Sequence, residues 1–119
     1  MKNNVVFLLD NDKDFLELYS KLLKSRGCQV FATDNLFLMI KYAQTALPEW
    51  IFIDESFIKS RKNDIIKIIN KKMPKDTTNF AIMSHHRSHK AVPSEIEFIY
   101  KPEVLEKIMK ISESSCNIN

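Results

Sequence analysis

The sequence predicts an α/β fold in which helices cover both faces of a parallel sheet. Short, continuous apolar runs alternate with segments whose apolar residues recur at helical spacing, and this pattern extends through most of the 119 residues. A run without polar residues is typical of a strand that is buried on both faces. Strands that alternate with helices are joined by crossovers, which make neighbouring strands parallel. We therefore expect one domain built on a five-stranded parallel sheet.

Apolar spacing and helix-ending residues define the expected elements. Strands are predicted at residues 5–9, 29–33, 50–53, 80–83 and 96–100, and helices at 15–23, at 35–45, around 65–69 and at 103–111. Gly27, the only glycine in the chain, stands where the first helix needs a left-handed cap. The apolar residues 36–40 are expected in the core. Residues 1–112 form the predicted domain, and the polar residues 113–119 are expected to be a disordered tail.

Composition and charge exclude several classes of protein. The chain is 45% hydrophobic and 28% charged, as ordinary globular proteins are. Its longest apolar runs are far too short to span a membrane, and the N-terminal run is too short for a signal peptide. The net charge of +3 comes from lysines scattered among acidic residues, so we expect no nucleic-acid partner. Cys28 and Cys116 fit no metal-binding spacing and indicate no disulfide framework, which favours a cytoplasmic protein.

Polar residues follow four of the predicted strands at their carboxyl ends. They are Asp10 and Asn11 after the first strand, Asp54 after the third, Ser84 after the fourth and Lys101 after the fifth. In parallel sheets these ends meet at one edge, where ligands bind. Each residue alone has a simpler explanation, such as a helix N-cap, a turn or a solvated lysine. Their joint occurrence at matching strand ends favours a ligand-binding site at that edge of the sheet.

The order and spacing of four segments resemble those of a response-regulator receiver domain of two-component signalling. The segments are FLLDND, WIFIDES, FAIMS and FIYKP. The resemblance covers residues 4–112 and identifies an atypical, stand-alone member of that family. It implies a flavodoxin-like, three-layer fold with the strand order 2-1-3-4-5. It also implies that Asp54 accepts a phosphoryl group as an aspartyl phosphate, given by a sensor histidine kinase or a histidine phosphotransfer protein.

The resemblance assigns a role to each residue at the strand ends. Asp54 is the phosphoacceptor, and Lys101 and Ser84 contact the phosphoryl group. Ser84 also forms the switch, together with Phe98. Weakly bound Mg²⁺ is the expected cofactor, because a carboxylate that attacks a phosphoryl group approaches another anion. The expected ligands of the ion are Asp10, Asn11, Asp54 and the backbone carbonyl of Ser56, with Asp12 as a further candidate.

Three features depart from the family pattern. Asn11 stands where a second acidic residue is usual, so Mg²⁺ should bind more weakly. His85 replaces a small residue and could crowd the phosphoryl site. Only sixteen residues separate Ser84 from Lys101, and they include few apolar side chains, which predicts that the fourth helix is shortened or missing. We therefore expect residues 85–95 to be mobile and the output surface near the fifth strand to be altered.

Signalling by protein–protein contact is the expected output. The partner is an unidentified effector protein, or a second copy of the chain in a homodimer, and neither a nucleic acid nor a membrane is expected. Beyond receiver-type self-phosphorylation and dephosphorylation, we expect no enzymatic activity.

Two other interpretations are open at this point. One is a degenerate receiver that binds proteins without phosphorylation, which Asn11, His85 and the short fourth-helix segment favour. The other is a haloacid-dehalogenase-type phosphatase, with Asp10 as the nucleophile and Asp12 as the general acid. The phosphatase interpretation gives Asp54 no role.

Overall fold

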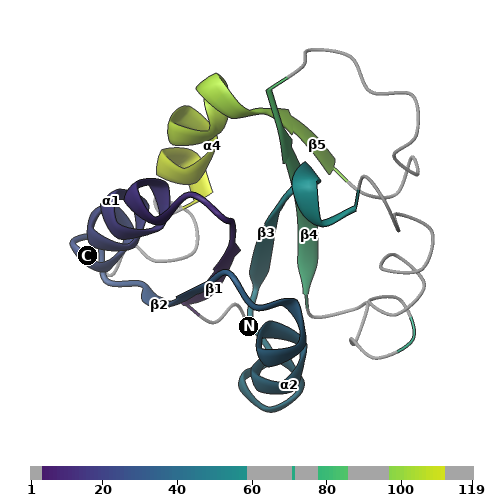
Figure 1. The fold of residues 1–119 in the computed structure, drawn as a ribbon. Helices are drawn as coiled ribbons and strands as arrows, with labels where there is room; N and C mark the ends of the chain where they lie inside the picture. Colours follow the sequence, from purple (N-terminus) through teal and green to yellow (C-terminus); the bar gives the residue numbers. More distant parts are fainter. Residues whose placement is uncertain (1–3, 59–70, 72–77, 86–96, 112–119) are drawn as a thin grey trace.

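The computed structural model describes residues 4–58, 71, 78–85 and 97–111. Within them lies a five-stranded parallel sheet of order β2-β1-β3-β4-β5, which confirms the predicted fold class and strand order (Figure 1). The strands are β1 (Val5–Leu9), β2 (Gln29–Thr33), β3 (Trp50–Asp54), β4 (Asn79–Ser84) and β5 (Glu97–Tyr100). The helices are α1 (Lys13–Lys24), α2 (Leu36–Ala46) and α4 (Val104–Ile111), with two short 3₁₀ helices, η1 (Glu55–Phe57) and η2 (Lys101–Glu103).

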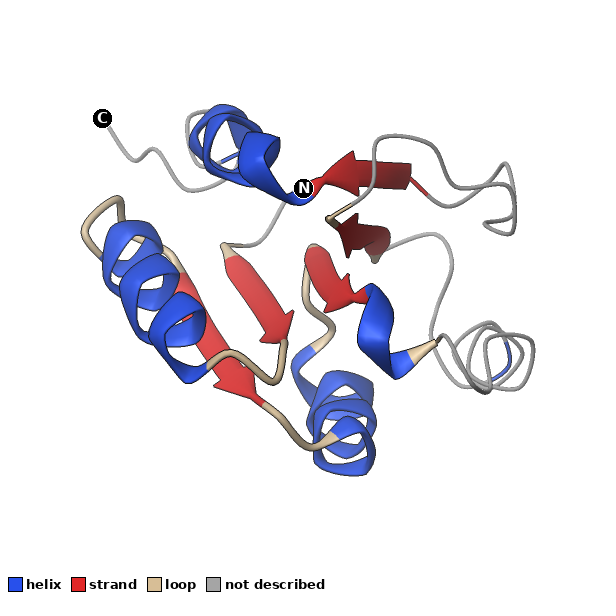
Figure 2. Cartoon of the chain, turned by 45° about the horizontal axis from the view of Figure 1, so that its top comes forward, coloured by secondary structure: helices blue, strands red, loops and turns tan. Residues whose placement is uncertain are grey.

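The sheet separates two hydrophobic cores, because alternate residues of a strand point to opposite faces. On one face, Val6, Leu8 and Phe52 pack with apolar residues of α1 and α4. On the other face, Phe7 and Ile53 pack with α2. Figure 2 shows α1 and α4 on one side of the sheet and α2 on the other. Burial on both faces explains why these strands read as continuous apolar runs.

Helix α1 begins and ends at the local signals that its sequence contains. Asp12 is the N-cap, and its Oδ1 accepts a hydrogen bond from the N–H of Phe15 at 3.1 Å. Beyond the last turn, Gly27 has a φ of 92°, and the N–H of Cys28 donates to the carbonyl of Leu23 at 3.1 Å. A glycine adopts this φ without steric cost. The predicted left-handed conformation at Gly27 is therefore confirmed.

Helix α2 departs from the sequence-based expectation in two ways. Phe37 is 71% exposed, although residues 36–40 are predicted to be core. Met39 is buried, and Phe37 lies two residues before it, which is about 200° around the helix and so on the opposite side. At its C-terminal end, α2 is capped by Leu47 in the left-handed conformation, with a φ of 50°. A residue with a Cβ pays roughly 1–2 kcal/mol for this conformation.

One expectation about the cysteines is wrong. Cys28 is buried and disulfide-bonded. The other cysteine of the chain, Cys116, lies outside the described residues. Sequence spacing gives no signal for such a bond, because a single pair of cysteines forms no framework.

Several expectations fall on parts of the chain that the structure does not describe. These are the helix around residues 65–69, the mobility of residues 86–95 with the shortened fourth helix, and the polar tail at 113–119. In the part of the chain that is described, no helix combines the length and the apolar character needed to cross a bilayer.

Candidate functional site

Three charged side chains meet at the carboxyl edge of the sheet. Asp10 follows β1, Asp54 ends β3, and Lys101 follows β5 as the first residue of η2. The Nζ of Lys101 donates to Asp10 Oδ2 at 2.8 Å and to Asp54 Oδ1 at 3.0 Å. The side chains are 2% exposed for Asp10, 9% for Asp54 and 10% for Lys101. One buried ammonium therefore bridges two buried carboxylates.

Backbone amides hold the second oxygen of each carboxylate. Asp10 Oδ1 accepts a hydrogen bond from the N–H of Asp12 at 2.9 Å. Asp54 Oδ2 accepts one from the N–H of Ser56 at 3.1 Å. In both cases the donor lies two residues after the acid, in the turn that follows the strand. These turns orient both carboxylates, so that the remaining oxygen of each meets Lys101.

The surroundings keep both partners of the ion pair charged. Burial acts to raise the pKa of Asp54, but the hydrogen bonds from Ser56 and Lys101 outweigh it and leave that pKa below its ordinary value. Burial acts to lower the pKa of Lys101, but the hydrogen bonds to Asp10 and Asp54 outweigh it and leave that pKa raised. At neutral pH, Asp54 is therefore a carboxylate and Lys101 is an ammonium.

A cavity of about 420 Å³ lies beside these groups. Its lining residues are Asp10, Asn11, Asp12, Asp54, Glu55, Ser56, His85 and Lys101. They include every residue that the sequence suggests for Mg²⁺. Two predicted switch residues are placed elsewhere: Ser84 is fully buried at the end of β4, and Phe98 in β5 packs against the core that contains α2.

The donors around the cavity fit Mg²⁺, which prefers hard oxygen ligands and keeps several waters. The available oxygens belong to the carboxylates of Asp10 and Asp54, the side-chain amide of Asn11 and the backbone of Ser56. The Nδ2 of Asn11 donates to Ser56 Oγ at 3.0 Å. Within the described ranges, no group of three His, Cys, Asp or Glu side chains could hold a metal ion. The fit to Mg²⁺ therefore rests on amide and carbonyl oxygens as well as on carboxylates.

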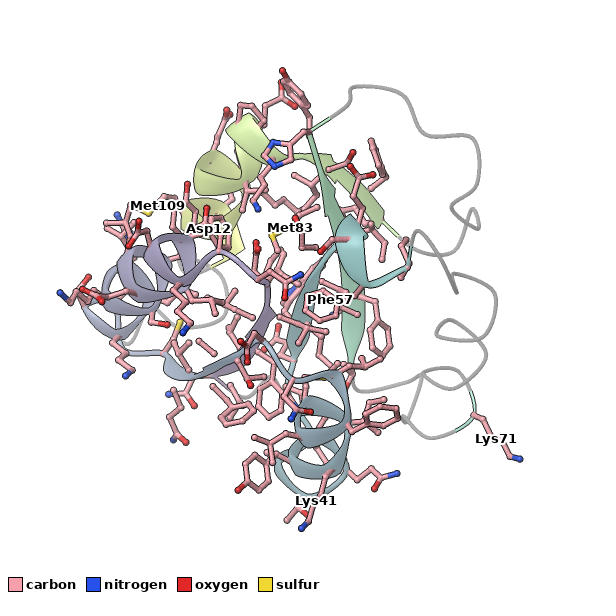
Figure 3. The ribbon with its side chains drawn as sticks, in the orientation of Figure 1. Asp12, Lys41, Phe57, Lys71, Met83 and Met109 are labelled. Carbon is pink, nitrogen blue, oxygen red and sulfur yellow. The ribbon has the colours of Figure 1, made fainter. Side chains whose placement is uncertain are left out.

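Asp12, the further candidate ligand, has a second role. It lies at the start of α1 (Figure 3), where its Oδ1 accepts the hydrogen bond from Phe15 that caps the helix. One oxygen of this carboxylate therefore stabilises α1.

Two residues at the site are not apparent from the sequence. The ring of Phe15 lies 4.7 Å from the Nζ of Lys101 and stacks on Tyr19, with ring centroids 4.2 Å apart. Glu55 is 2% exposed and lines the cavity. The available signals were an aromatic residue in the first turn of α1 and an acid directly after Asp54. Both signals are weak, because a phenylalanine in a helix usually packs in the core and an acid after a strand is usually solvated.

The comparisons with known proteins concern the fold. No protein-family model and no curated protein matches the chain. Among solved structures, a response regulator receiver domain protein from Methanospirillum hungatei is similar, with a TM-score of 0.73 and 14% identity over 93% of each chain. The beryllofluoride-activated NtrC receiver domain has a TM-score of 0.69 and 18% identity, over 98% of this chain and 96% of that one. The pseudo-receiver domain of the CikA protein has a TM-score of 0.63 and 10% identity, over the whole of both chains.

These structures define the class of fold. The chain has the fold of response-regulator receiver domains. Because a pseudo-receiver shares this fold, the fold alone does not decide whether Asp54 is phosphorylated.

Proposed function

We propose that the chain is a phosphoacceptor receiver domain, which takes a phosphoryl group on Asp54 and signals through protein–protein contact. The observation that supports this most is the position of Lys101, which is bonded to both Asp10 and Asp54 beside the cavity. An ammonium in this position can neutralise part of the charge of a phosphoryl group on Asp54, and it leaves the Asp10 carboxylate available to bind a cation. The lowered pKa of Asp54 keeps the attacking group ionised.

In the proposed reaction, a carboxylate oxygen of Asp54 attacks the phosphorus of a phosphohistidine on the donor protein. A P–O bond forms, the P–N bond breaks, and the imidazole keeps the electron pair and takes a proton from solvent. Lys101 neutralises part of the charge on the phosphoryl oxygens. Ser84 donates its hydroxyl to one of these oxygens, as the resemblance to receivers implies. The donor is a sensor histidine kinase or a histidine phosphotransfer protein.

The charges at the site support a role for a divalent cation in the proposed reaction. Asp10, Asp54 and Lys101 together carry a charge of −1 (two carboxylates and one ammonium). An aspartyl phosphate has a charge of roughly −2 in place of the −1 of Asp54, so the sum becomes about −2. Mg²⁺, held by Asp10, Asn11, Asp54 and the Ser56 carbonyl, would supply two compensating charges when bound. Asn11 adds no charge, so the proposed binding is weak.

The proposed output passes through β4 and β5. Ser84 ends β4, and Phe98 lies on the neighbouring strand, level with Ile82. A shift of Ser84 toward the phosphoryl group would change the space beside β5 and with it the packing of Phe98. The altered surface would bind an effector protein or a second copy of the chain.

Phosphorylation of the full chain by acetyl phosphate tests this function. With Mg²⁺ present, intact mass spectrometry should show one added phosphoryl group on the wild type and none on Asp54→Asn. Beryllofluoride should shift the NMR signals of the residues around the cavity in the wild type alone. If the wild type shows no labelling and no NMR shifts, the proposal is contradicted.

A degenerate receiver is the second candidate, and one observation favours it. His85, a bulky residue in place of a small one, lines the cavity beside Asp54. In a degenerate receiver, His85→Ala would not restore labelling. If His85 only crowds the site, His85→Ala should label faster than the wild type. A phosphatase is the least supported candidate, because the Asp12 carboxylate, its proposed general acid, caps α1. Turnover of p-nitrophenyl phosphate by the wild type would support this candidate.

A further inference from the structure

The Lys101 ammonium has an aromatic neighbour in addition to its two carboxylates. An ammonium has three N–H donors, and Lys101 directs two hydrogen bonds to Asp10 and Asp54. The face of the Phe15 ring lies 4.7 Å from the same nitrogen. Ring faces attract cations, most strongly where water is excluded, and the Lys101 side chain is only 10% exposed.

The Phe15 ring is itself fixed from two directions. Its face stacks on Tyr19, at 4.2 Å between centroids and 24° between planes. The backbone N–H of Phe15 donates to Asp12 Oδ1 at 3.1 Å in the cap of α1, which fixes the position of the residue that carries the ring. The pKa of Tyr19 is raised by burial, and Lys101 acts in the opposite direction, so the lysine charge reaches this aromatic pair.

Four contacts form a closed circuit around the site. Lys101 donates to Asp10 Oδ2, and Asp10 Oδ1 accepts from the N–H of Asp12. Asp12 Oδ1 accepts from the N–H of Phe15, and the ring of Phe15 lies over Lys101. The start of α1 is thereby joined to the lysine through both its backbone and its first aromatic side chain.

From this circuit we infer that Phe15 is a positioning residue for Lys101. Lysine has a flexible four-carbon stem, so an ammonium that must meet a phosphoryl group benefits from being placed beforehand. The ring restricts the ammonium to the side of the two carboxylates, and it displaces water that would screen the charge. Phe15 does not contact the reacting atoms; it acts through Lys101. The benefit of this placement depends on the proposed function. The contact between Phe15 and Lys101 does not depend on it.

A simpler role for Phe15 would be to fill space beside α1. A space-filling residue is indifferent to the charge of its neighbour, whereas a cation–π contact disappears when the charge is removed. The distinction can be measured with a double-mutant cycle between Phe15 and Lys101.

The test uses the full chain with Phe15→Leu and with Phe15→Tyr, which keeps the aromatic face, each in the wild type and in the Lys101→Met background. Phe15→Leu should lower the urea midpoint clearly more when Lys101 is present than in the Lys101→Met background. It should also slow labelling by acetyl phosphate by about three- to tenfold, with an unchanged Mg²⁺ requirement, while Phe15→Tyr stays within about twofold of the wild type.

Equal midpoint shifts in the two backgrounds would overturn the inference. So would a decrease in labelling rate with Phe15→Tyr that is as large as the decrease with Phe15→Leu. If the wild type is not labelled at all, the proposed function fails. The urea comparison still decides the Phe15–Lys101 contact in that case.

Discussion

The side chain of Asn11 donates a hydrogen bond to the hydroxyl of Ser56, at 3.0 Å and across 45 residues of sequence. This bond joins the turn after β1 to the turn after β3, the two turns that orient Asp10 and Asp54. The proposed metal site is therefore braced by an amide where an additional carboxylate would repel the acids already present.

Asn11→Asp should strengthen Mg²⁺ binding and weaken the metal-free fold. The new carboxylate is a hard anionic ligand, so we expect roughly tenfold tighter binding. Without metal, its repulsion from Asp10 and Asp54 should lower the free energy of unfolding. A Mg²⁺ titration followed by the amide NMR signals of the site, with urea unfolding in EDTA, measures both effects. Equal Mg²⁺ affinity in the two proteins would contradict the assignment of Asn11.

Lys101→Met should destabilise the protein far more than Lys107→Met. The first change leaves two buried carboxylates without their ammonium, which costs about 3–5 kcal/mol. The matched control breaks a pair between Lys107 and Glu97 that is 2.7 Å long but one-third exposed, which typically costs below about 1 kcal/mol. Urea unfolding at neutral pH compares them, and similar losses would argue against a buried ion triad.

Stability should fall in acid through Asp54 and in strong base through Lys101. The folded-state pKa of Asp54 lies below its ordinary value of 3.8, so its contribution is complete above that pH and is lost as the pH falls through the lowered pKa. The pKa of Lys101 is raised above 10.5, so its contribution is complete below that pH and is lost as the pH rises through the raised value. In urea titrations, the advantage of the wild type over Asp54→Asn should be constant between these limits and shrink below the acid one.

Asp12→Ala and Asp12→Asn should separate the two roles of Asp12. Loss of the N-cap in Asp12→Ala should cost about 1 kcal/mol of stability, whereas Asp12→Asn keeps the acceptor for the N–H of Phe15 and should cost little. If Asp12 also binds the metal, Asp12→Asn should weaken Mg²⁺ binding despite its normal stability. Unchanged Mg²⁺ affinity in Asp12→Asn would show that Asp12 acts only as the N-cap of α1.

Leu47→Asn should stabilise the protein by about 0.5–1 kcal/mol. Asparagine tolerates the left-handed conformation at the end of α2, and Leu47 is 40% exposed, so little packing is lost. Leu47→Ala is the matched control, since it also removes the apolar side chain but lacks the short polar group with which asparagine hydrogen-bonds locally in this conformation. Thermal unfolding of both variants checks this, and equal midpoints would show that asparagine gives no relief at this position.

The strands could be predicted because the sheet is buried on both faces, whereas their order was implied only by the resemblance to receiver domains. Phe7 and Leu8 belong to different cores, so both must be apolar, and the strand shows as an uninterrupted run. The exposure of Phe37 could have been predicted from its own helix. Lys41, Gln44 and Thr45 lie four, seven and eight residues after it, so they mark the same side of α2 as the exposed one. Treating residues 36–40 as one apolar run missed this polar face.

The candidate site was predictable to the extent that strand ends determine it. Asp10, Asp54 and Lys101 follow buried runs, so a parallel sheet brings them to one edge. The contact of Phe15 with Lys101 was not predictable, because it depends on how α1 packs beside η2, far away in sequence. The burial of Glu55 depends in the same way on how the turn after β3 folds back.

Lys101 gives the acid pair a counter-ion that is covalently part of the chain. A cluster of carboxylates that depends on a dissolved ion can fold only when that ion is available. Here the compensating charge is supplied by the polypeptide itself, within 3.0 Å of both acids. Lys101 therefore supplies a counter-charge for these two acids that does not depend on a divalent ion, and under the proposed function the pocket would load and release Mg²⁺ without losing this contact.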